Sequence, residues 1–217
     1  MRKRRSVPIR TNPTFAFVVD GDCEVWYFQM LKRNERSLTI SIEPRIPQKK
    51  ELFEQFRIVK ALSIEYTKVF WIIDLDVILE EARKTRKGKK SALQCFIEYK
   101  ECLRQECPNV VVIVNNPCIE YFLLLHFEAT FRCFENCSKA ETQLKKHLKD
   151  YEKTLKYYTK KDKDIYLRLR PFLKGAIRNA KKSGGFNAED ASGSITEMHL
   201  FFEAEEFGEH FSQKIKK

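Results

Sequence analysis

The sequence predicts an α/β fold in which a largely parallel sheet is flanked by helices. Strand-like hydrophobic runs alternate with helical patterns through the first 130 residues. Two of the runs, 14–19 and 68–73, show no polar alternation, which is typical of strands covered on both faces. From Ser138 onward the patterns are helical only. We therefore expect a roughly four-stranded, mostly parallel sheet with a helical C-terminal part packed on it.

The first part of the chain supplies the strands and the helices between them. We expect strands at 14–19, 37–42, 69–73 and 110–114, and helices near 26–31, 52–63, 93–103 and 119–127. The charged segment 83–90 is predicted to be an exposed loop. Asn116 and Pro117 fit a helix cap and a first-turn proline, so the last of these helices should begin directly after them.

The later part of the chain is expected to form three helices. The segment Ser138 to Glu141 is a capping box, and it predicts a long amphipathic helix that continues to Leu155. A second helix over 166–180 should be interrupted near Pro171. A further capping box at Ser194 to Glu197 predicts a last helix. The chain then divides into a basic N-terminal arm (1–13), an α/β core (14–137) and a helical extension (138–217).

Basic charge is concentrated in one part of this extension. The chain carries 41 Lys and Arg against 30 Asp and Glu, a net charge of +11, and the segment 138–182 holds 15 of the basic and 5 of the acidic residues. The aromatic residues interleaved with them are Tyr151, Tyr157, Tyr158, Tyr166 and Phe172. Cations attract phosphates and aromatic rings stack on unpaired bases, so this segment predicts a nucleic-acid surface. The alternative is a solvated helical face.

The cysteines and the hydropathy bear on the compartment. Seven cysteines without a Cys-x-x-Cys pair predict reduced thiols and a cytoplasmic protein. A zinc site built from Cys133, Cys137 and His126 can be drawn, but its spacing fits no common structural pattern. No apolar run approaches the ~20 residues that span a bilayer, so we expect no membrane partner.

Carboxylates follow three of the predicted strands. Asp20 and Glu24 come after the first run, Asp74 and Asp76 after the third, and Glu120 after the fourth. If strand geometry persists through residue 76, the two Asp side chains of the third run point to one side. Ligands of parallel sheets bind beyond the carboxyl ends of the strands, and Mg²⁺ prefers oxygen ligands. The pattern predicts a Mg²⁺ or Mn²⁺ site, although each acid taken alone is also common as a helix cap or turn residue.

Three motifs resemble those of the RloB-like family, which belongs to the wider Toprim superfamily. The first is Val-Asp-Gly-Asp-Cys-Glu-Val-Trp-Tyr-Phe over 19–28, and the second is Ile-Asp-Leu-Asp over 73–76. The third, Asn-Pro-Cys-Ile-Glu-Tyr-Phe-Leu-Leu-Leu-His-Phe over 116–127, is similar to the family's Asn-Pro-Cys-Phe-Glu-x-Trp-Leu-Leu-His-Phe signature. The chain departs from the family at Asp20, where a Glu is usual, and at Cys23, where a Thr is usual.

The resemblance implies a Toprim-like core and a Mg²⁺-dependent nuclease that acts in phage defence. Together with the acids at the strand ends, this favours metal ligands at Asp20, Glu24, Asp74 and Asp76, and a catalytic set that adds Glu120. Lys153 resembles a family lysine for which phosphate contact is expected, and the alternative for it is a solvated helix lysine. The residues expected to bind the nucleic-acid substrate, DNA or RNA, are Lys153, Lys156, Lys160, Arg168, Arg170 and Arg178.

Two other functions remain open at this point. One is a Toprim relative without turnover that senses nucleic acid and acts with a partner protein of a defence system. The other is a phosphatase of the haloacid dehalogenase type, because 70–76 is also similar to the opening strand of that family. Val77 and Ile78 stand where that family has Gly-Thr, which argues against the phosphatase.

Overall fold

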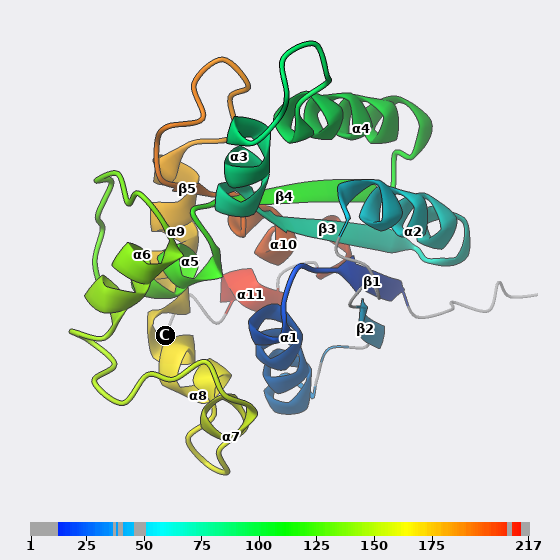
Figure 1. Cartoon of the computed structure of the whole chain (residues 1–217). Coiled ribbons are helices and arrows are strands. Elements are labelled where there is room, and N and C mark those ends of the chain that lie inside the picture. The colour runs from blue at the N-terminus through cyan, green and yellow to red at the C-terminus, as the bar shows by residue number, and fades with distance from the viewer. Residues whose placement is uncertain (1–12, 37, 39–40, 46–50, 208–209, 214–217) are drawn as a thin grey trace, which may run out of the picture.

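An open five-stranded sheet forms the centre of the molecule (Figure 1). The computed structural model describes residues 13–36, 38, 41–45, 51–207 and 210–213. The strands are β1 (Thr14–Val18), β2 (Ser41–Arg45), β3 (Lys68–Asp74), β4 (Val110–Asn116) and β5 (Ile195–Thr196), in the order β2-β1-β3-β4-β5. The first four run parallel and β5 is antiparallel to β4. The predicted α/β fold with four parallel strands is confirmed.

The strand register brings three carboxyl-terminal ends to one edge of the sheet. Phe17 of β1 pairs with Phe70 of β3, and Asp74 of β3 pairs with Asn115 of β4. Since β1, β3 and β4 are neighbours, the segments that follow them leave the sheet side by side.

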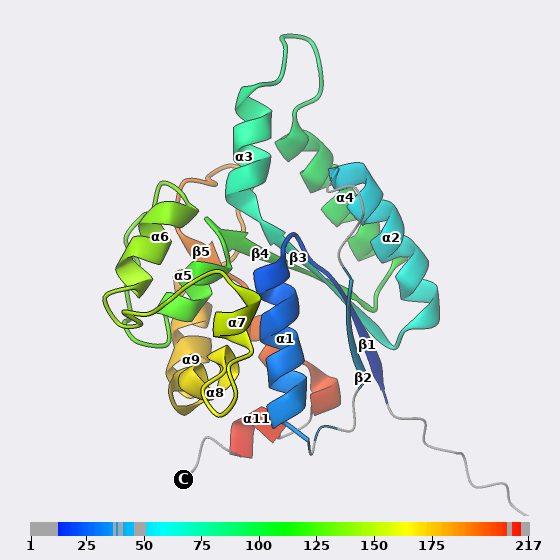
Figure 2. The ribbon, with the colours of Figure 1, turned by 60° about the horizontal axis from the view of Figure 1, so that its bottom comes forward.

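Helices cover both faces of the sheet. The helices of the first half are α1 (Asp22–Asn34), α2 (Leu52–Glu65), α3 (Leu75–Arg83), α4 (Ala92–Glu106) and α5 (Ile119–Leu124). Those of the second half are α6 (Cys137–Leu144), α7 (Leu155–Tyr158), α8 (Ile165–Leu169), α9 (Leu173–Ser183), α10 (His199–Phe202) and α11 (His210–Gln213), with 3-10 turns η1 (Arg170–Phe172) and η2 (Glu205–Phe207). Figure 2 shows α2 and α4 on one side of the sheet and α1, α7 and α8 on the other.

The alternation of side chains along the strands builds two cores. Phe15, Phe17 and Phe70 face α1 and the C-terminal helices, where Phe70 and Phe201 have ring centroids 5.3 Å apart. Trp71 faces the opposite way and packs against Phe96 of α4, with ring centroids 5.8 Å apart. Because both faces are buried, these strands are apolar throughout, as the sequence predicted.

The C-terminal part differs from the prediction in two places. The helix expected from Ser138 to Leu155 ends at Leu144, and its cap is Asn136, whose side chain accepts a hydrogen bond from the Lys139 backbone. The capping box at Ser194 to Glu197, which was expected to begin the last helix, instead contains the strand β5. Ser194 and Glu197 accept hydrogen bonds from strand and loop backbone, so both are used by tertiary contacts rather than by a helix.

Other local predictions have mixed outcomes. The break near Pro171 is confirmed, since η1 separates α8 from α9. Asn116 is not the expected helix cap: it ends β4 and donates to the backbone oxygens of Ala191 and Gly193, while Cys118 caps α5. The strand predicted over 37–42 begins at Ser41, and residues 37, 39 and 40 lie outside the described residues, as does most of the N-terminal arm. The exposed loop predicted over 83–90 is confirmed except at Arg83, which is the last residue of α3; most of the residues that follow are exposed.

Within the described part of the chain, none of the helices has the length and hydrophobicity required to cross a bilayer.

Candidate metal centre

Five carboxylates lie at the carboxyl-terminal edge of the sheet. Asp20 follows β1, and Asp74 is the last residue of β3. Glu24, Asp76 and Glu120 lie in the first turns of α1, α3 and α5. The three helices start where the three adjacent strands end, so acids far apart in the sequence meet.

Asp20 is the carboxylate that joins the first strand to the third. Its Oδ2 atom accepts a hydrogen bond of 2.9 Å from the backbone N–H of Asp74. Its Oδ1 atom accepts one of 2.8 Å from Nε2 of Gln55, a buried residue of α2. The Gln55 Oε1 atom in turn accepts from Nε1 of Trp71 at 2.8 Å. This chain of hydrogen bonds fixes the side chain of Asp20 beside the end of β3.

Burial and mutual repulsion perturb the innermost carboxyl groups. Glu24 is 3% exposed, and burial together with the carboxylates of Glu120 and Asp20 raises its pKa to about 8. Burial and the carboxylates of Glu24 and Asp20 raise the pKa of Asp74 well above its usual range. Like charges this close cannot all remain ionised without a compensating cation, so the group binds protons at neutral pH when no metal is present.

Asp76 reaches the group by a different route from the one predicted. The strand ends at Asp74 and α3 begins at Leu75, so the expectation that strand geometry aligns the two Asp side chains is wrong. Asp76 instead lies in the first helical turn, and its Oδ2 atom accepts a hydrogen bond of 3.3 Å from the Cys137 backbone. Burial raises its pKa, and this hydrogen bond opposes the rise.

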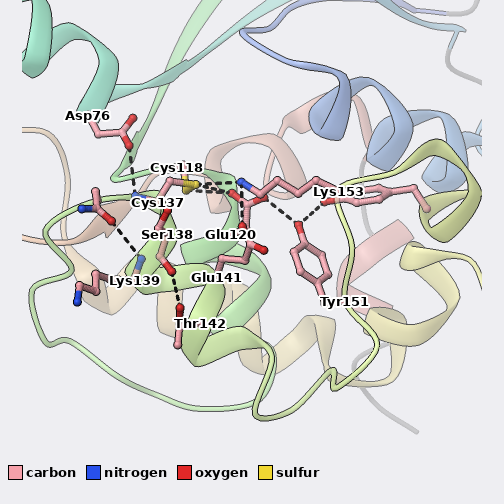
Figure 3. The surroundings of a disulfide bond; sticks show 12 residues. Asp76, Cys118, Glu120, Cys137, Ser138, Lys139, Glu141, Thr142, Tyr151 and Lys153 are labelled. Carbon is pink, nitrogen blue, oxygen red and sulfur yellow. Dashed lines mark hydrogen bonds and ion pairs between the residues drawn. A yellow bond between two sulfur atoms is a disulfide. The ribbon is translucent and has the colours of Figure 1, made fainter.

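Glu120 is the most enclosed acid of the five and has a cationic partner. It is 1% exposed, and its Oε1 atom lies 2.9 Å from Nζ of Lys153 and 2.8 Å from the hydroxyl of Tyr151 (Figure 3). Burial lowers the pKa of Lys153, but Glu120 outweighs that effect and the net direction is upward. Lys153 therefore carries its charge beside the acids while its side chain stays 37% exposed.

A protein-family model matches the chain over residues 15–204, under the description RloB-like protein. The match includes all five carboxylates and Lys153. The chain belongs to the RloB-like family. A comparison with curated proteins and another with solved structures gave no match.

In this RloB-like protein, one pair of cysteines is bonded, contrary to the expectation of reduced thiols. Cys118 and Cys137 form a disulfide, while Cys23, Cys95, Cys102, Cys107 and Cys133 are free. The structure also does not bring together the zinc set of Cys133, Cys137 and His126, which its spacing in the sequence already argued against. Cys137 is bonded to Cys118, and the ring Nδ1 of buried His126 lies 3.0 Å from the Phe122 carbonyl. Cys133 donates to the Ser192 carbonyl at the surface.

Of the six basic residues predicted to bind substrate, Lys153 lies in the carboxylate group and the other five lie elsewhere. Arg168 makes a bidentate ion pair with Asp150, in which its Nη1 and Nη2 atoms lie 2.9 and 3.0 Å from the two carboxylate oxygens. Nε of Arg170 lies 3.1 Å from Oε1 of the buried Glu35. The remaining three, Lys156, Lys160 and Arg178, are exposed.

The aromatic residues of this segment are not a stacking surface. Tyr151, Tyr158 and Tyr166 are at most 1% exposed, and Tyr157 is 6% exposed. Their rings pack on one another and on Tyr27, so they belong to the core. Phe172 is the one of the five that is exposed, at 47%. The prediction that these rings stack on bases is therefore wrong for the four tyrosines, and it stays a prediction for Phe172.

Two contributors to the site were missed in the sequence. Gln55 orients Asp20, and Tyr151 donates to Glu120. Neither role could be recognised from the neighbouring residues in the sequence. Gln55 lies in the middle of a helix, and Tyr151 occurs among lysines, which favours a place on the basic surface. Asn115 pairs with Asp74 across the sheet, and its buried Nδ2 atom has no hydrogen-bond partner among the described residues.

The donor set fits a hard divalent cation. It consists of carboxylate oxygens from three strand ends, and the buried Oδ1 atom of Asp74 has no hydrogen-bond partner within the described part of the chain. An orphaned buried oxygen among raised-pKa acids is the arrangement that a cation would stabilise most. Among the described residues, one group of His, Cys, Asp and Glu has ligand atoms that all lie within 4.8 Å of one another, namely Cys118, Glu120 and Cys137, and the disulfide closes it to metal. Asp20, Glu24, Asp74 and Asp76 do not form such a compact group, so their oxygens would have to move closer together to share one ion.

Proposed function

We propose that this protein is a divalent-metal-dependent nuclease that hydrolyses phosphodiester bonds of DNA or RNA. The observation that carries the proposal is the convergence of five carboxylates from three neighbouring strand ends beside an ammonium group. The site is acidic although the chain as a whole has a net charge of +11. Its carboxylates would repel an anionic substrate unless a bound cation neutralised them.

Asp20, Glu24, Asp74 and Asp76 would hold the metal, Mg²⁺ or Mn²⁺. The chemistry that such an ion supplies is activation of water and neutralisation of charge on the phosphoryl group. Asp20 is held by Gln55 and by the Asp74 backbone, so one ligand is oriented in advance. Such orientation of a ligand by its surroundings typically contributes about 10–100-fold to metal affinity.

Glu120 and Lys153 would act on the substrate side of the site. Lys153 is partly exposed and charged, so its Nζ atom can contact a non-bridging phosphate oxygen. Glu120 would hold that ammonium in place through Oε1, and its Oε2 atom would serve as a further metal ligand or as a proton acceptor near the scissile group. Lys156, Lys160 and Arg178 are exposed cations that can extend the contact along the backbone, whereas Arg168 and Arg170 are already paired with acids.

The test is a cleavage assay on total tRNA, plasmid DNA and single-stranded DNA with Mg²⁺ or Mn²⁺. Wild type should cleave at least one substrate, Asp74→Asn should not, and chelation should stop the reaction. The matched control is Glu80→Gln, an exposed acid of the same α3 helix that pairs with Lys84. Intact substrates throughout, together with saturable metal binding, would replace the nuclease by the sensing module that acts with a partner protein.

The role in phage defence is part of the same proposal and rests on the family resemblance. Cells that express wild type should resist infection by phages that plate normally on cells expressing Asp74→Asn. Equal plating on both strains, with both proteins present at equal levels, would contradict that role.

A further inference from the structure

The Cys118–Cys137 disulfide joins two segments that carry carboxylates of the site. Cys118 caps α5, two residues before Glu120, and Cys137 is the first residue of α6. The backbone N–H of Cys137 also donates to Asp76. Figure 3 shows the bond lying between Glu120 and Asp76. The covalent state of this pair is therefore coupled to the position of two acids.

Both sulfur atoms contact the same oxygen of Glu120. Oε2 lies 2.9 Å from Sγ of Cys118 and 3.0 Å from Sγ of Cys137. A carboxylate oxygen only accepts hydrogen bonds, and a thiol donates one whereas a disulfide sulfur has no hydrogen to donate. In the dithiol form, two S–H groups can point at Oε2. In the disulfide form, both donors are gone and Oε2 keeps its lone pairs for another partner.

The other oxygen of Glu120 is engaged in either state. Oε1 is held by Tyr151 and Lys153, so the redox state of the pair changes the hydrogen bonding of Oε2 selectively. Oε2 contacts the two sulfurs, whereas Tyr151 and Lys153 contact Oε1, so the hydrogen bonds that Oε2 accepts depend on the state of the two cysteines. The disulfide thus frees a ligand atom at the edge of the carboxylate group.

The surroundings of the pair suit reversible chemistry. Cys118 is 1% exposed, while Cys137 is only partly buried, so a small oxidant reaches Cys137 first. Nζ of Lys153 lies 3.2 Å from Sγ of Cys137, and this ammonium stabilises negative charge on that sulfur during exchange.

We propose that Cys118 and Cys137 form a reversible oxidation site that controls metal binding: the disulfide form binds a divalent cation more tightly than the dithiol form. The inference rests on the proposed metal-dependent function. A peroxide is the class of oxidant that fits. The Cys137 thiolate attacks one oxygen of hydrogen peroxide, the O–O bond breaks, and the other oxygen leaves as water, so that a sulfenic acid forms on Cys137. The Cys118 thiol then attacks that sulfur and a second water leaves, so two thiols are oxidised and one peroxide is reduced.

Return to the dithiol form needs a dithiol reductant. One of its thiolates attacks a sulfur of the pair and forms a mixed disulfide, and its second thiol resolves that bond. The reductant leaves as a disulfide, and both protein sulfurs recover their protons.

The experiment compares Mn²⁺ affinity, measured by electron paramagnetic resonance, in peroxide-oxidised and in reduced, desalted protein. Peptide mapping should show the Cys118–Cys137 link in the oxidised sample alone. We expect the oxidised form to bind Mn²⁺ about 10-fold more tightly. This is the lower end of the change in metal affinity, about 10–100-fold, that follows when a hydrogen-bond partner of a metal ligand is altered. Cys133→Ser, which alters an exposed cysteine outside the pair, should keep the full response.

Two double variants separate the hydrogen-bond effect from the covalent link. Cys118→Ser/Cys137→Ser retains two donors for Oε2 and should bind Mn²⁺ weakly under both conditions. Cys118→Ala/Cys137→Ala removes the donors and should bind more tightly than the serine variant. Equal affinity of oxidised and reduced wild type, with the link formed, would overturn the redox inference and leave the proposed function standing. Failure of both forms to bind Mn²⁺ would overturn both.

Discussion

Replacement of Glu24 by Gln should make the metal-free protein more stable at alkaline pH and leave it unchanged at acidic pH. Burial and neighbouring carboxylates raise the pKa of Glu24 from 4.5 to about 8. An acid whose pKa is raised on folding binds its proton more tightly in the folded state. Its effect on stability is absent below pH 4.5, grows as the pH rises, and is complete above pH 8.

The magnitude follows from the two pKa values. At about 1.36 kcal/mol for each pH unit, ionisation of Glu24 costs the folded protein up to about 5 kcal/mol at pH 9. That is comparable with the whole stability of a marginal domain, about 5–15 kcal/mol. Gln has nearly the same shape and no charge, so the variant avoids this cost. It also lessens the repulsion on Asp74.

Urea denaturation in the presence of chelator, at pH 5, 7 and 9, measures the effect. The free energy of unfolding of wild type should fall below that of Glu24→Gln by several kcal/mol at pH 9, and the two should agree at pH 5. Added Mg²⁺ should restore wild type at pH 9 more than it restores the variant. A difference between the two proteins that is the same at all three pH values would refute the reasoning, because only ionisation makes it depend on pH.

Three further predictions concern the same region and the charged surface. Asp74→Asn should lower the cleavage rate at least about 100-fold, because loss of a metal ligand should cost more than loss of a residue that only orients a ligand. In the same assay, Glu80→Gln should change the rate by less than about twofold. Gln55→Leu should lower the free energy of unfolding by roughly 2–4 kcal/mol in urea titrations, because it leaves Trp71 Nε1 and Asp20 Oδ1 without their partner; unchanged stability would argue against that hydrogen-bond chain. Nucleic-acid affinity measured by fluorescence anisotropy should fall steeply between 50 and 200 mM salt, and a flat salt dependence would exclude phosphate contacts as its main source.

The sequence predicted the parts of the site that depend on strand ends. The apolar runs before Asp20 and Asp74 mark buried parallel strands, and the ends of neighbouring parallel strands meet at one edge. Glu24 and Glu120 follow from the same logic, because helices begin where those strands end. Asp76 was placed by the wrong argument, since a helix starting at Leu75 cannot be distinguished from a strand that continues for two residues.

Tertiary contacts account for most of what could not be predicted. Tyr151 and Tyr158 occur among lysines, as the aromatic residues of a nucleic-acid surface do, and only their packing in the folded chain shows that they are core residues. The strand β5 has two residues and exists through its pairing with Asn115 and Asn116. The Cys118–Cys137 bond joins residues 19 apart, and the connectivity of seven cysteines cannot be deduced from their spacing.

The central claim is that the carboxylates at the ends of β1 and β3 bind one or more divalent ions together. Calorimetric titration of wild type with Mn²⁺ at pH 7, repeated in buffers of different ionisation enthalpy, tests it directly. We predict saturable binding that releases protons, because Glu24, with its pKa raised to about 8, is protonated before the ion enters. We also predict loss of that binding in Asp74→Asn. Binding without proton release, or with equal affinity in Asp74→Asn, would contradict the claim.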